Sequence, residues 1–359
     1  MDMIYLLLFA GLFMGWSLGT NDAANAFGTA VATRVVSYRS AVIIIAICII
    51  IGAVAGGDQN IGNVAELATS NQVIATAEQV EDAIEEDNVK TLRLKSAIKA
   101  AIIFLCSGIT VFVMSYLKFP VSANQSITGA IIGWGLFYAD YSDPQVLAIN
   151  LPQIGKFAST WLLNPLGACI ISFVLVLLFN HLLAHRLSSL GSYDKLLKIG
   201  YLCAGAFASL SIGLNSSANV TALYFDAAYT QTGVAANLLT DARLAAAIGG
   251  ISIAVGVLTF SRRVMMTVGS SIADINPIEG FLVILGMALT VVIMGSWMSI
   301  PVSTSQAVVG AVIGAGLTRG VKAVHFGVLK NIALAWIGSP TIDGLLTYVV
   351  AVSLKSYFM

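Results

Sequence analysis

A polar cluster interrupts the apolar N-terminal segment of this chain, with the sequence G-T-N-D-A-A-N-A over Gly19–Ala26. Its residues Asn21, Asp22 and Asn25 stand at i, i+1 and i+4, so a helix places one carboxylate and two amides on one face. A charged side chain inside an apolar span is costly and is a functional candidate by default. Because oxygen atoms of this kind bind hard cations, we predict a Na⁺ site here. A helix cap at Asp22 is the alternative, since Thr20 to Asp22 also resembles a helix start.

Two further blocks supply uncharged hydrogen-bond donors: P-V-S-A-N-Q-S-I-T-G-A-I-I-G over Pro120–Gly133 and P-V-S-T-S-Q-A-V-V-G-A-V-I-G over Pro301–Gly314. Each opens with proline and suits a short half-helix at mid-membrane, whose N-terminus presents unpaired N–H groups and a positive dipole end. Such a site holds a tetrahedral oxyanion without a buried arginine. Helix packing by small polar residues is the alternative, although glutamine is too large for that role. The predicted substrate-binding residues are Ser122, Gln125, Ser126, Thr128, Ser303, Thr304, Ser305 and Gln306.

No catalytic motif accompanies these residues. The sequence has no P-loop, no G-x-S-x-G, no H-E-x-x-H and no Cys-x-x-Cys. Asn, Ser, Thr and Gln bind and orient ligands better than they catalyse reactions, so we predict a translocation site, no enzyme and no cofactor besides the coupling ion. A channel is a further alternative, but it would need a continuous pore with charged rings at its mouths.

The elements that position these residues are predicted to be membrane helices. The chain has 359 residues, of which 58% are hydrophobic and 10% charged. Several segments without any charged residue, such as 40–57 and 157–185, are long enough to cross about 30 Å of hydrocarbon as a helix. They lack the alternation of a membrane barrel strand, and the net charge of zero does not suggest a nucleic-acid partner. The predicted fold class is an all-α polytopic membrane protein.

The sequence is duplicated. G-T-N-D-A-A-N at Gly19–Asn25 recurs as G-L-N-S-S-A-N at Gly213–Asn219, the two proline blocks form a second pair, and W-L-L-N-P at Trp161–Pro165 recurs as W-I-G-S-P at Trp336–Pro340. Three pairs in the same order indicate a duplication, which is common among transporters. About five crossings fall in each half, and an odd number requires the halves to face opposite ways. We therefore predict two inverted repeats with broken or reentrant helices, and we expect breaks at the Gly19 and Gly213 blocks as well.

The predicted boundaries follow from this duplication. The first repeat covers 1–180 and includes an extracellular acidic loop over 58–95, a cytoplasmic linker covers 181–198, and the second repeat covers 199–359. Lys and Arg in short loops favour the cytoplasmic side, and Arg34, Arg39, Arg262 and Arg263 fall there if the N-terminus is outside. We expect both termini outside a cell membrane, or inner membrane in a bacterium.

The G-T-N-D-A-A-N-A-F-G-T block resembles the signature of the inorganic phosphate transporter (PiT) family, and the P-V-S-x-x-Q blocks are similar to its other repeated motifs. Many members have His where this chain has Gln125 and Gln306. The resemblance implies a cation-coupled symporter that imports phosphate, forms a homodimer and uses Na⁺ or H⁺ as its coupling ion. It also implies that the cation site of Asn21, Asp22 and Asn25 is completed by their counterparts, Asn215, Ser216 and Asn219.

One position departs from the family pattern. The second signature of the family usually repeats N-D, and this chain has Ser216 at the aspartate position. With one central carboxylate fewer, the chain is expected to bind fewer Na⁺ ions or to use a proton, and Asp226 is a candidate for compensation. Sulfate is the alternative substrate. Phosphate is favoured because its protonated form can donate a hydrogen bond to Asp22, which sulfate cannot do.

Overall fold

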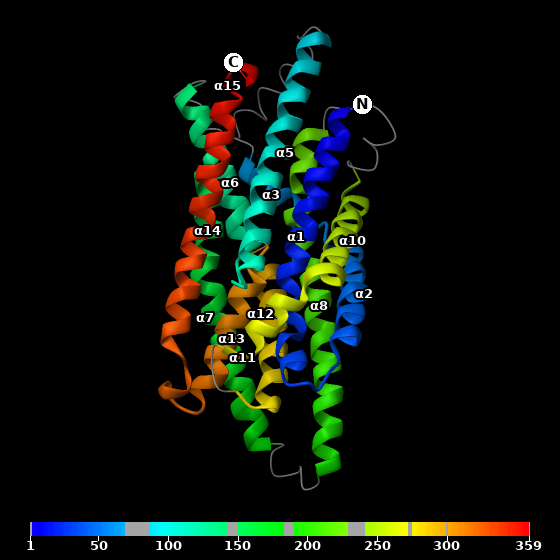
Figure 1. The fold of residues 1–359 in the computed structure, drawn as a ribbon, viewed down its shortest axis with the longest axis vertical. Helices are drawn as coiled ribbons and strands as arrows, with labels where there is room; N and C mark the ends of the chain where they lie inside the picture. The colour runs from blue at the N-terminus through cyan, green and yellow to red at the C-terminus, as the bar shows by residue number, and fades with distance from the viewer. Residues whose placement is uncertain are drawn as a thin grey trace.

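The computed structural model describes residues 2–68, 86–141, 150–182, 190–228, 241–271, 275–298 and 301–358. This part of the chain forms an elongated bundle of α-helices that run mostly along the long axis (Figure 1). The predicted fold class, an all-α polytopic membrane protein, is confirmed. Both chain termini lie at the same end of the bundle, which we call the terminal end.

The first half of the bundle holds six helices of the described chain: α1 (Asp2–Ala32), α2 (Tyr38–Gly56), α3 (Ile61–Ala68), α5 (Glu86–Tyr116), α6 (Ala123–Tyr141) and α7 (Leu151–Leu182). The second half contains α8 (Leu190–Ala228), α10 (Ala242–Phe260), α11 (Arg262–Ser271), α12 (Pro277–Met298), α13 (Thr304–Leu317), α14 (Phe326–Ser353) and α15 (Lys355–Phe358). Seven of these helices contain a segment long and apolar enough to cross a membrane, namely α2, α5, α7, α8, α10, α12 and α14.

Two helical hairpins enter the bundle from opposite ends. The α5–α6 hairpin starts and finishes at the terminal end, whereas the α12–α13 hairpin starts and finishes at the other end (Figure 1). Their turns meet inside the bundle, where Asn124 Nδ2 donates a hydrogen bond to the Pro301 carbonyl at 2.7 Å. The 14 residues of α13 span only about 21 Å at 1.5 Å per residue. The ten predicted crossings therefore include hairpin arms that stop at mid-bundle, and α6 and α13 begin inside the two proline blocks as expected.

The expectation of breaks at Gly19 and Gly213 is wrong. Helix α1 runs for 31 residues and α8 for 39 residues, and each passes unbroken through its polar block. Neither block contains proline, so the backbone bonds of the helix are retained and the polar side chains find partners on other helices. The capping alternative for Asp22 is excluded by the same observation, because Asp22 lies 20 residues after the start of α1 at Asp2.

Helices occupy parts of two segments that were predicted to connect membrane helices. The acidic segment 58–95 was predicted as a loop, but α3 occupies Ile61–Ala68 and α5 begins at Glu86, while residues 69–85 lie outside the described part. Within the predicted linker 181–198, α8 already begins at Leu190. These helical segments are polar. A prediction based on apolar runs alone therefore does not detect them.

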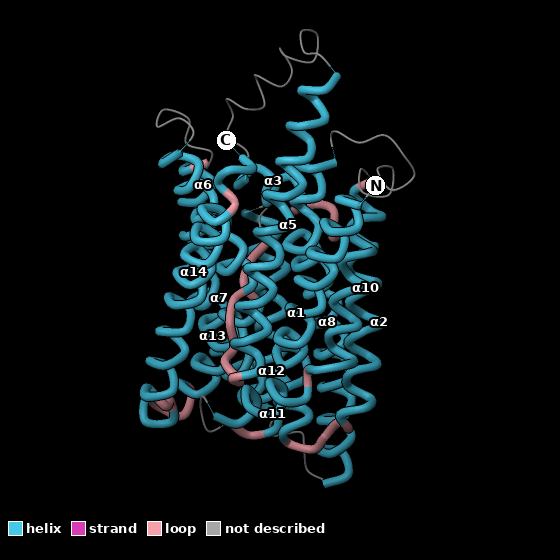
Figure 2. Tube along the Cα trace, turned by 45° about the horizontal axis from the view of Figure 1, so that its top comes forward, coloured by secondary structure: helices cyan, strands magenta, loops and turns pink. Residues whose placement is uncertain are grey.

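Each hairpin arm that begins at a proline block packs against the last long helix of the opposite half. Helix α6 lies along α14 and α13 lies along α7. A Cβ atom on Gly129 of α6 would stand 2.2 Å from the Pro340 carbonyl oxygen, and one on Gly310 of α13 would stand 2.1 Å from that of Pro165. Glycine is thus required for this close approach, and the third pair of repeated blocks contributes the surfaces on which the arms rest. Figure 2 shows these helices side by side in a second view.

Candidate functional site

The carboxylate of Asp22 lies at the centre of the bundle and is buried. Asn25 Nδ2, one turn along α1, stands 3.1 Å from Asp22 Oδ1. Ser216 Oγ, on α8, donates to Asp22 Oδ2 at 3.4 Å. The equivalent positions of the two related blocks therefore face each other, and the structure brings the predicted first and second halves of the site together.

The amides of α1 join the carboxylate to both hairpins. Asn25 Nδ2 also lies 3.0 Å from Thr304 Oγ1 and 3.1 Å from Ser305 Oγ, at the start of α13. Asn21 Nδ2 donates to the Phe119 carbonyl at 3.2 Å, in the turn between α5 and α6. Ser305 Oγ donates to Asn21 Oδ1 at 3.3 Å. A displacement of either hairpin turn must therefore break hydrogen bonds to α1.

Helix α8 makes a matching set of contacts. Asn215 Nδ2 donates to the Val302 carbonyl at 2.7 Å and Asn215 Oδ1 accepts from the Val302 amide at 2.8 Å. This pairing satisfies a non-helical residue that is buried in the bundle, as backbone at this depth requires. Asn219 Nδ2 donates to Asn124 Oδ1 on α6. Because Asn124 and Ser305 occupy equivalent positions in the repeated blocks, this contact matches the one between Asn25 and Ser305.

The two half-helices present their N-termini to this centre. Ser303 caps α13 by accepting a hydrogen bond from the Gln306 amide at 3.2 Å, and Ser122 Oγ accepts from the Gln125 amide at 3.3 Å. Asn164 of α7 holds the Ser303 carbonyl at 2.7 Å. Two positive dipole ends and several hydroxyls therefore converge on one small volume, which is an arrangement suited to an anion.

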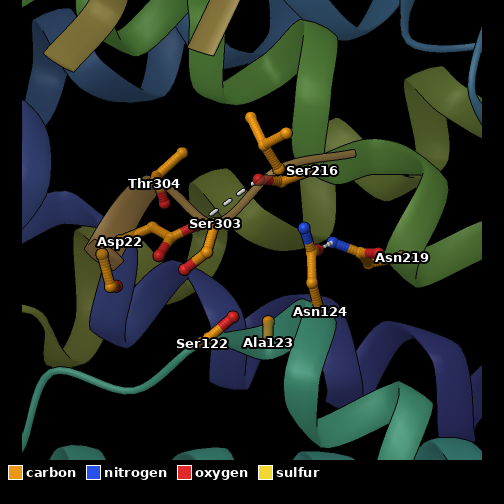
Figure 3. Close-up of a pocket in the computed structure, with 10 residues that line it drawn as sticks. Asp22, Ser122, Ala123, Asn124, Ser216, Asn219, Ser303 and Thr304 are labelled. Atoms are coloured by element: carbon orange, nitrogen blue, oxygen red, sulfur yellow. Dashed lines mark hydrogen bonds between the residues drawn. The ribbon is translucent and has the colours of Figure 1, made fainter. Parts of the chain in front are cut away.

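A cavity of about 10 Å³ occupies the point of convergence, and Figure 3 shows Asn219 directed at Asn124 beside it. That volume is about what one water molecule needs. The hairpin turns must therefore move apart before a tetrahedral oxyanion can enter. The lining residues are Asp22, Ser122, Ala123, Asn124, Ser216, Asn219, Val302, Ser303, Thr304 and Ser305.

Asp22 is the only charged residue among those that line this cavity. No described lysine or arginine offsets it there, so an ionised Asp22 gives the site a net negative charge. An oxyanion placed next to that carboxylate would be repelled strongly in a medium of low dielectric constant. The site can hold both only if a cation or a proton enters with the anion.

The structure divides the predicted site residues into three groups. Those that line the cavity are Asp22, Ser122, Ser216, Asn219, Ser303, Thr304 and Ser305. Those that hold lining residues through hydrogen bonds are Asn21, Asn25 and Asn215. Those that are buried but do not line the cavity are Gln125, Ser126, Thr128 and Gln306. Each residue of the last group is the third or a later residue of its half-helix, whereas the first two residues of each half-helix line the cavity.

Sequence reasoning missed Asn124, which lines the cavity and bridges the two hairpin turns. The available signal was its alignment with Ser305, which was among the predicted residues. Asparagine was passed over in favour of the Ser, Gln and Thr residues around it. The side chain of Asp226 lies outside the described residues, so its proposed compensating role is not addressed by the fold.

Comparison with known proteins identifies the family. Residues 18–347 match the sequence profile of the phosphate transporter family. The chain belongs to that family. It is therefore a transport protein and not an enzyme, and the resemblance noted in the sequence is confirmed.

Relatives within this phosphate transporter family match over nearly their whole length. A protein named as a phosphate permease in Thermococcus kodakarensis is 26% identical, with 96% of each chain covered. Its counterparts are 28% identical in Pyrococcus abyssi, with 98% of each chain covered, and 26% identical in Methanocaldococcus jannaschii, with 97% of this chain and 96% of that protein covered. The solved structure of a sodium-dependent phosphate transporter superposes with a TM-score of 0.76 at 23% identity, covering 99% of this chain and 100% of that one. This likeness shows that the two proteins share the fold.

Proposed function

We propose that this protein is a secondary active symporter that imports inorganic phosphate together with Na⁺, or with H⁺ in its place. The observation that carries the proposal is the lone carboxylate of Asp22 in a cavity otherwise lined by uncharged groups. An anion that must bind beside an anionic side chain needs a cation at the same time. The transport of phosphate is then coupled to that of the cation by electrostatic interactions within one site.

The cation would bind on the α1 and α8 side of the cavity. Asn21, Asp22, Asn25 and Asn215 are the proposed Na⁺ ligands, with Ser216 and Asn219 completing the site. Asn25 Oδ1 is buried and has no hydrogen-bond partner among the described residues, so it is free to act as a ligand. Its amide group already lies beside Asp22. Carboxylate and amide oxygens together form a suitable set for a hard monovalent cation.

The anion would bind between the two half-helix N-termini. Ser122, Ser303, Thr304 and Ser305 offer hydroxyls there, and Asn124 adds an amide. Gln125, Gln306, Ser126 and Thr128 contribute only if the half-helices rotate on opening. Phosphate is favoured over sulfate because its protonated form can donate a hydrogen bond to Asp22, whereas sulfate offers acceptors alone.

Transport would proceed by alternating access between two inverted repeats, with both termini outside the cell membrane or inner membrane. This proposal is supported by the opposite entry of the two hairpins (Figure 1) and by the repeated blocks. The homodimer remains an expectation from the family. A channel is disfavoured, because the cavity is only about 10 Å³ in volume and hydrogen bonds join both hairpin turns to their neighbours beside it.

The test is uptake of radiolabelled phosphate into proteoliposomes, with Na⁺ and pH gradients imposed separately and sulfate as a competitor. We expect phosphate to accumulate against its gradient when Na⁺ is high outside, and only slight inhibition by sulfate. Accumulation driven by pH alone would assign H⁺ as the coupling ion. If the phosphate concentration inside the proteoliposomes never rises above the concentration outside, symport is contradicted.

A further inference from the structure

A second carboxylate lies inside the bundle, away from the cavity. Asp343, in the middle of α14, is 0% exposed. Neither of its carboxylate oxygens has a hydrogen-bond partner among the described residues. An intramembrane acidic group without a partner is costly and is rarely retained without a role.

Hydroxyl groups from two other helices lie beside this carboxylate. Thr110 of α5 and Ser126 of α6 face Asp343, and Ser126 Oγ is also buried without a hydrogen-bond partner in the described chain. Thr347, one turn further along α14, has an unpartnered hydroxyl as well. Thr110 and Ser126 therefore lie close enough to interact with the carboxylate of Asp343, although no hydrogen bond of ordinary geometry satisfies its oxygens in the described chain.

No described cation neutralises this cluster. The titratable neighbour is the thiol of Cys106 on α5. The lysines nearer the terminal end have other partners, since Lys95 Nζ donates to the Phe358 carbonyl at 2.8 Å and Lys99 Nζ to the Ala68 carbonyl at 3.0 Å. A carboxylate surrounded by hydroxyl oxygens, with no amine or guanidinium nearby, is a ligand set for a hard cation. A single negative charge is balanced by a monovalent ion.

We infer that Asp343, Thr110 and Ser126 form a second Na⁺ site between α14 and the α5–α6 hairpin. The site is particular to one half of the molecule: aligning the W-x-x-x-P blocks places Ala168 at the position equivalent to Asp343. Asp343 therefore provides a second carboxylate within the membrane helices, whereas the central position equivalent to Asp22 is occupied by Ser216. Its coupling role rests on the proposed symport, whereas the binding of Na⁺ does not.

The location links this ion to the central cavity. The amide of Ser126 bonds to the Ser122 carbonyl at 3.0 Å, so the second site lies one helical turn from a residue that lines the cavity. An ion held by Ser126 and Asp343 would fasten α6 to α14 along the contact of Gly129 with Pro340. Na⁺ bound there would hold the first hairpin in the closed position that the structure describes.

The test is direct binding of ²²Na⁺ to the purified full-length protein, with choline as the replacement cation and no phosphate present. We expect Asp343→Asn to bind one Na⁺ fewer than the unaltered protein, and Asp22→Asn to lose a different one. Thr110→Val is expected to weaken Na⁺ binding at the second site about tenfold, as loss of supporting groups does in metal sites. Thr341→Val is the matched control, because Thr341 lies on the same helix, is exposed and donates to the Ile337 carbonyl.

Unchanged Na⁺ stoichiometry in Asp343→Asn would overturn the inference and identify Asp343 as a carboxylic acid that stays protonated. If that variant cannot be purified, Thr110→Val decides, and wild-type Na⁺ affinity in it would be equally decisive against the site. Because the assay contains no phosphate, its outcome is separate from that of the proposed symport. If the unaltered protein failed to take up phosphate but Asp343→Asn still bound one Na⁺ fewer, the transport proposal would be refuted and the second Na⁺ site would stand.

Discussion

Asp22 and Ser216 hold equivalent positions in two related blocks, and their side chains touch at 3.4 Å. One is anionic when ionised and the other is neutral, so the centre of the molecule is chemically asymmetric even though its framework is repeated. When Asp22 is ionised, the cavity therefore carries a single negative charge. That charge is the quantity on which the behaviour of the site depends.

Replacing Asp22 by Asn should abolish Na⁺-driven phosphate uptake. The amide keeps the shape of the side chain but removes the charge that requires a co-transported cation. Uptake in proteoliposomes should fall to about a hundredth or less, as expected from loss of roughly 3 kcal/mol of charge-assisted contacts. Thr29→Val is the control on the same helix, since its hydroxyl bonds to the Gly280 carbonyl away from the cavity. Wild-type rates with unchanged Na⁺ dependence would remove Asp22 from the mechanism.

Replacing Ser216 by Asp should make phosphate uptake more demanding of Na⁺. Two carboxylates in contact disfavour each other's ionised form, and a second cation relieves the repulsion. We expect lower uptake at low Na⁺, recovery at high Na⁺, and a steeper dependence of the rate on Na⁺ concentration. The control is Ser216→Asn, which adds bulk without charge. Ser217→Asp would not serve as a control, because Ser217 packs against Gly57. Equal Na⁺ dependence in both variants would show that charge at this position does not set the coupling.

The hairpin arms α6 and α13 make the close helix contacts that position the site. Helix α13 approaches α7 at Gly310 and α6 approaches α14 at Gly129, and each contact is backbone to backbone. These glycines allow each half-helix to approach the backbone of its neighbour closely. The same contacts place the Ser122 and Ser303 caps at the cavity.

Gly310→Ala should destabilise the protein by about 1–3 kcal/mol, the usual cost of forcing extra volume into a packed interface. A Cβ atom there would lie 2.1 Å from the Pro165 carbonyl oxygen, so α13 must shift. The measurement is the midpoint of thermal unfolding in detergent. Gly338→Ala on α14 is the control, because nothing lies within 4 Å of its added Cβ, and its midpoint should be unchanged or slightly higher. Equal midpoints for the two variants would contradict the role of Gly310.

Some features of the helices could be predicted from the sequence, and others could not. The half-helix starts inside the two proline blocks followed from the opening prolines, which are a local signal. The unbroken course of α1 and α8 did not, because their polar residues find partners on other helices, and such partners are invisible along the chain. Asn124 and Asp343 were missed although the sequence held a signal for each: Asn124 aligns with Ser305, and Asp343 is a carboxylate within an apolar segment.

The two hairpins enter the bundle from opposite ends (Figure 1). Both termini lie at one end of the bundle (Figure 1), and Arg243, at the start of α10, stands 3.7 Å from the half-buried Asp58. The partly buried pair of Arg319 with Glu279, at 2.9 Å, closes the base of the α12–α13 hairpin at the other. The duplication and the membrane class could be predicted from the sequence alone, but the crossing of each arm to the opposite half could not, since no pattern records which helix meets which.

The proposed orientation can be checked with single cysteines and a membrane-impermeant maleimide in intact cells. Arg243→Cys, at the terminal end, should be labelled without permeabilisation, because that end is expected to be outside. Val321→Cys, which is exposed in the turn after α13 at the other end, should be labelled only after permeabilisation. The reverse pattern would place the termini inside the cell.

The exchange of arms between halves has a consequence for how the protein is made. Helix α6 leaves the ribosome long before α14, so its glycine face has no lasting partner until the final long helix is synthesised. The two halves are interleaved, and neither can complete its own interior. We expect that fragments 1–182 and 190–359, produced separately, would each be degraded, and that their co-production would restore a stable protein.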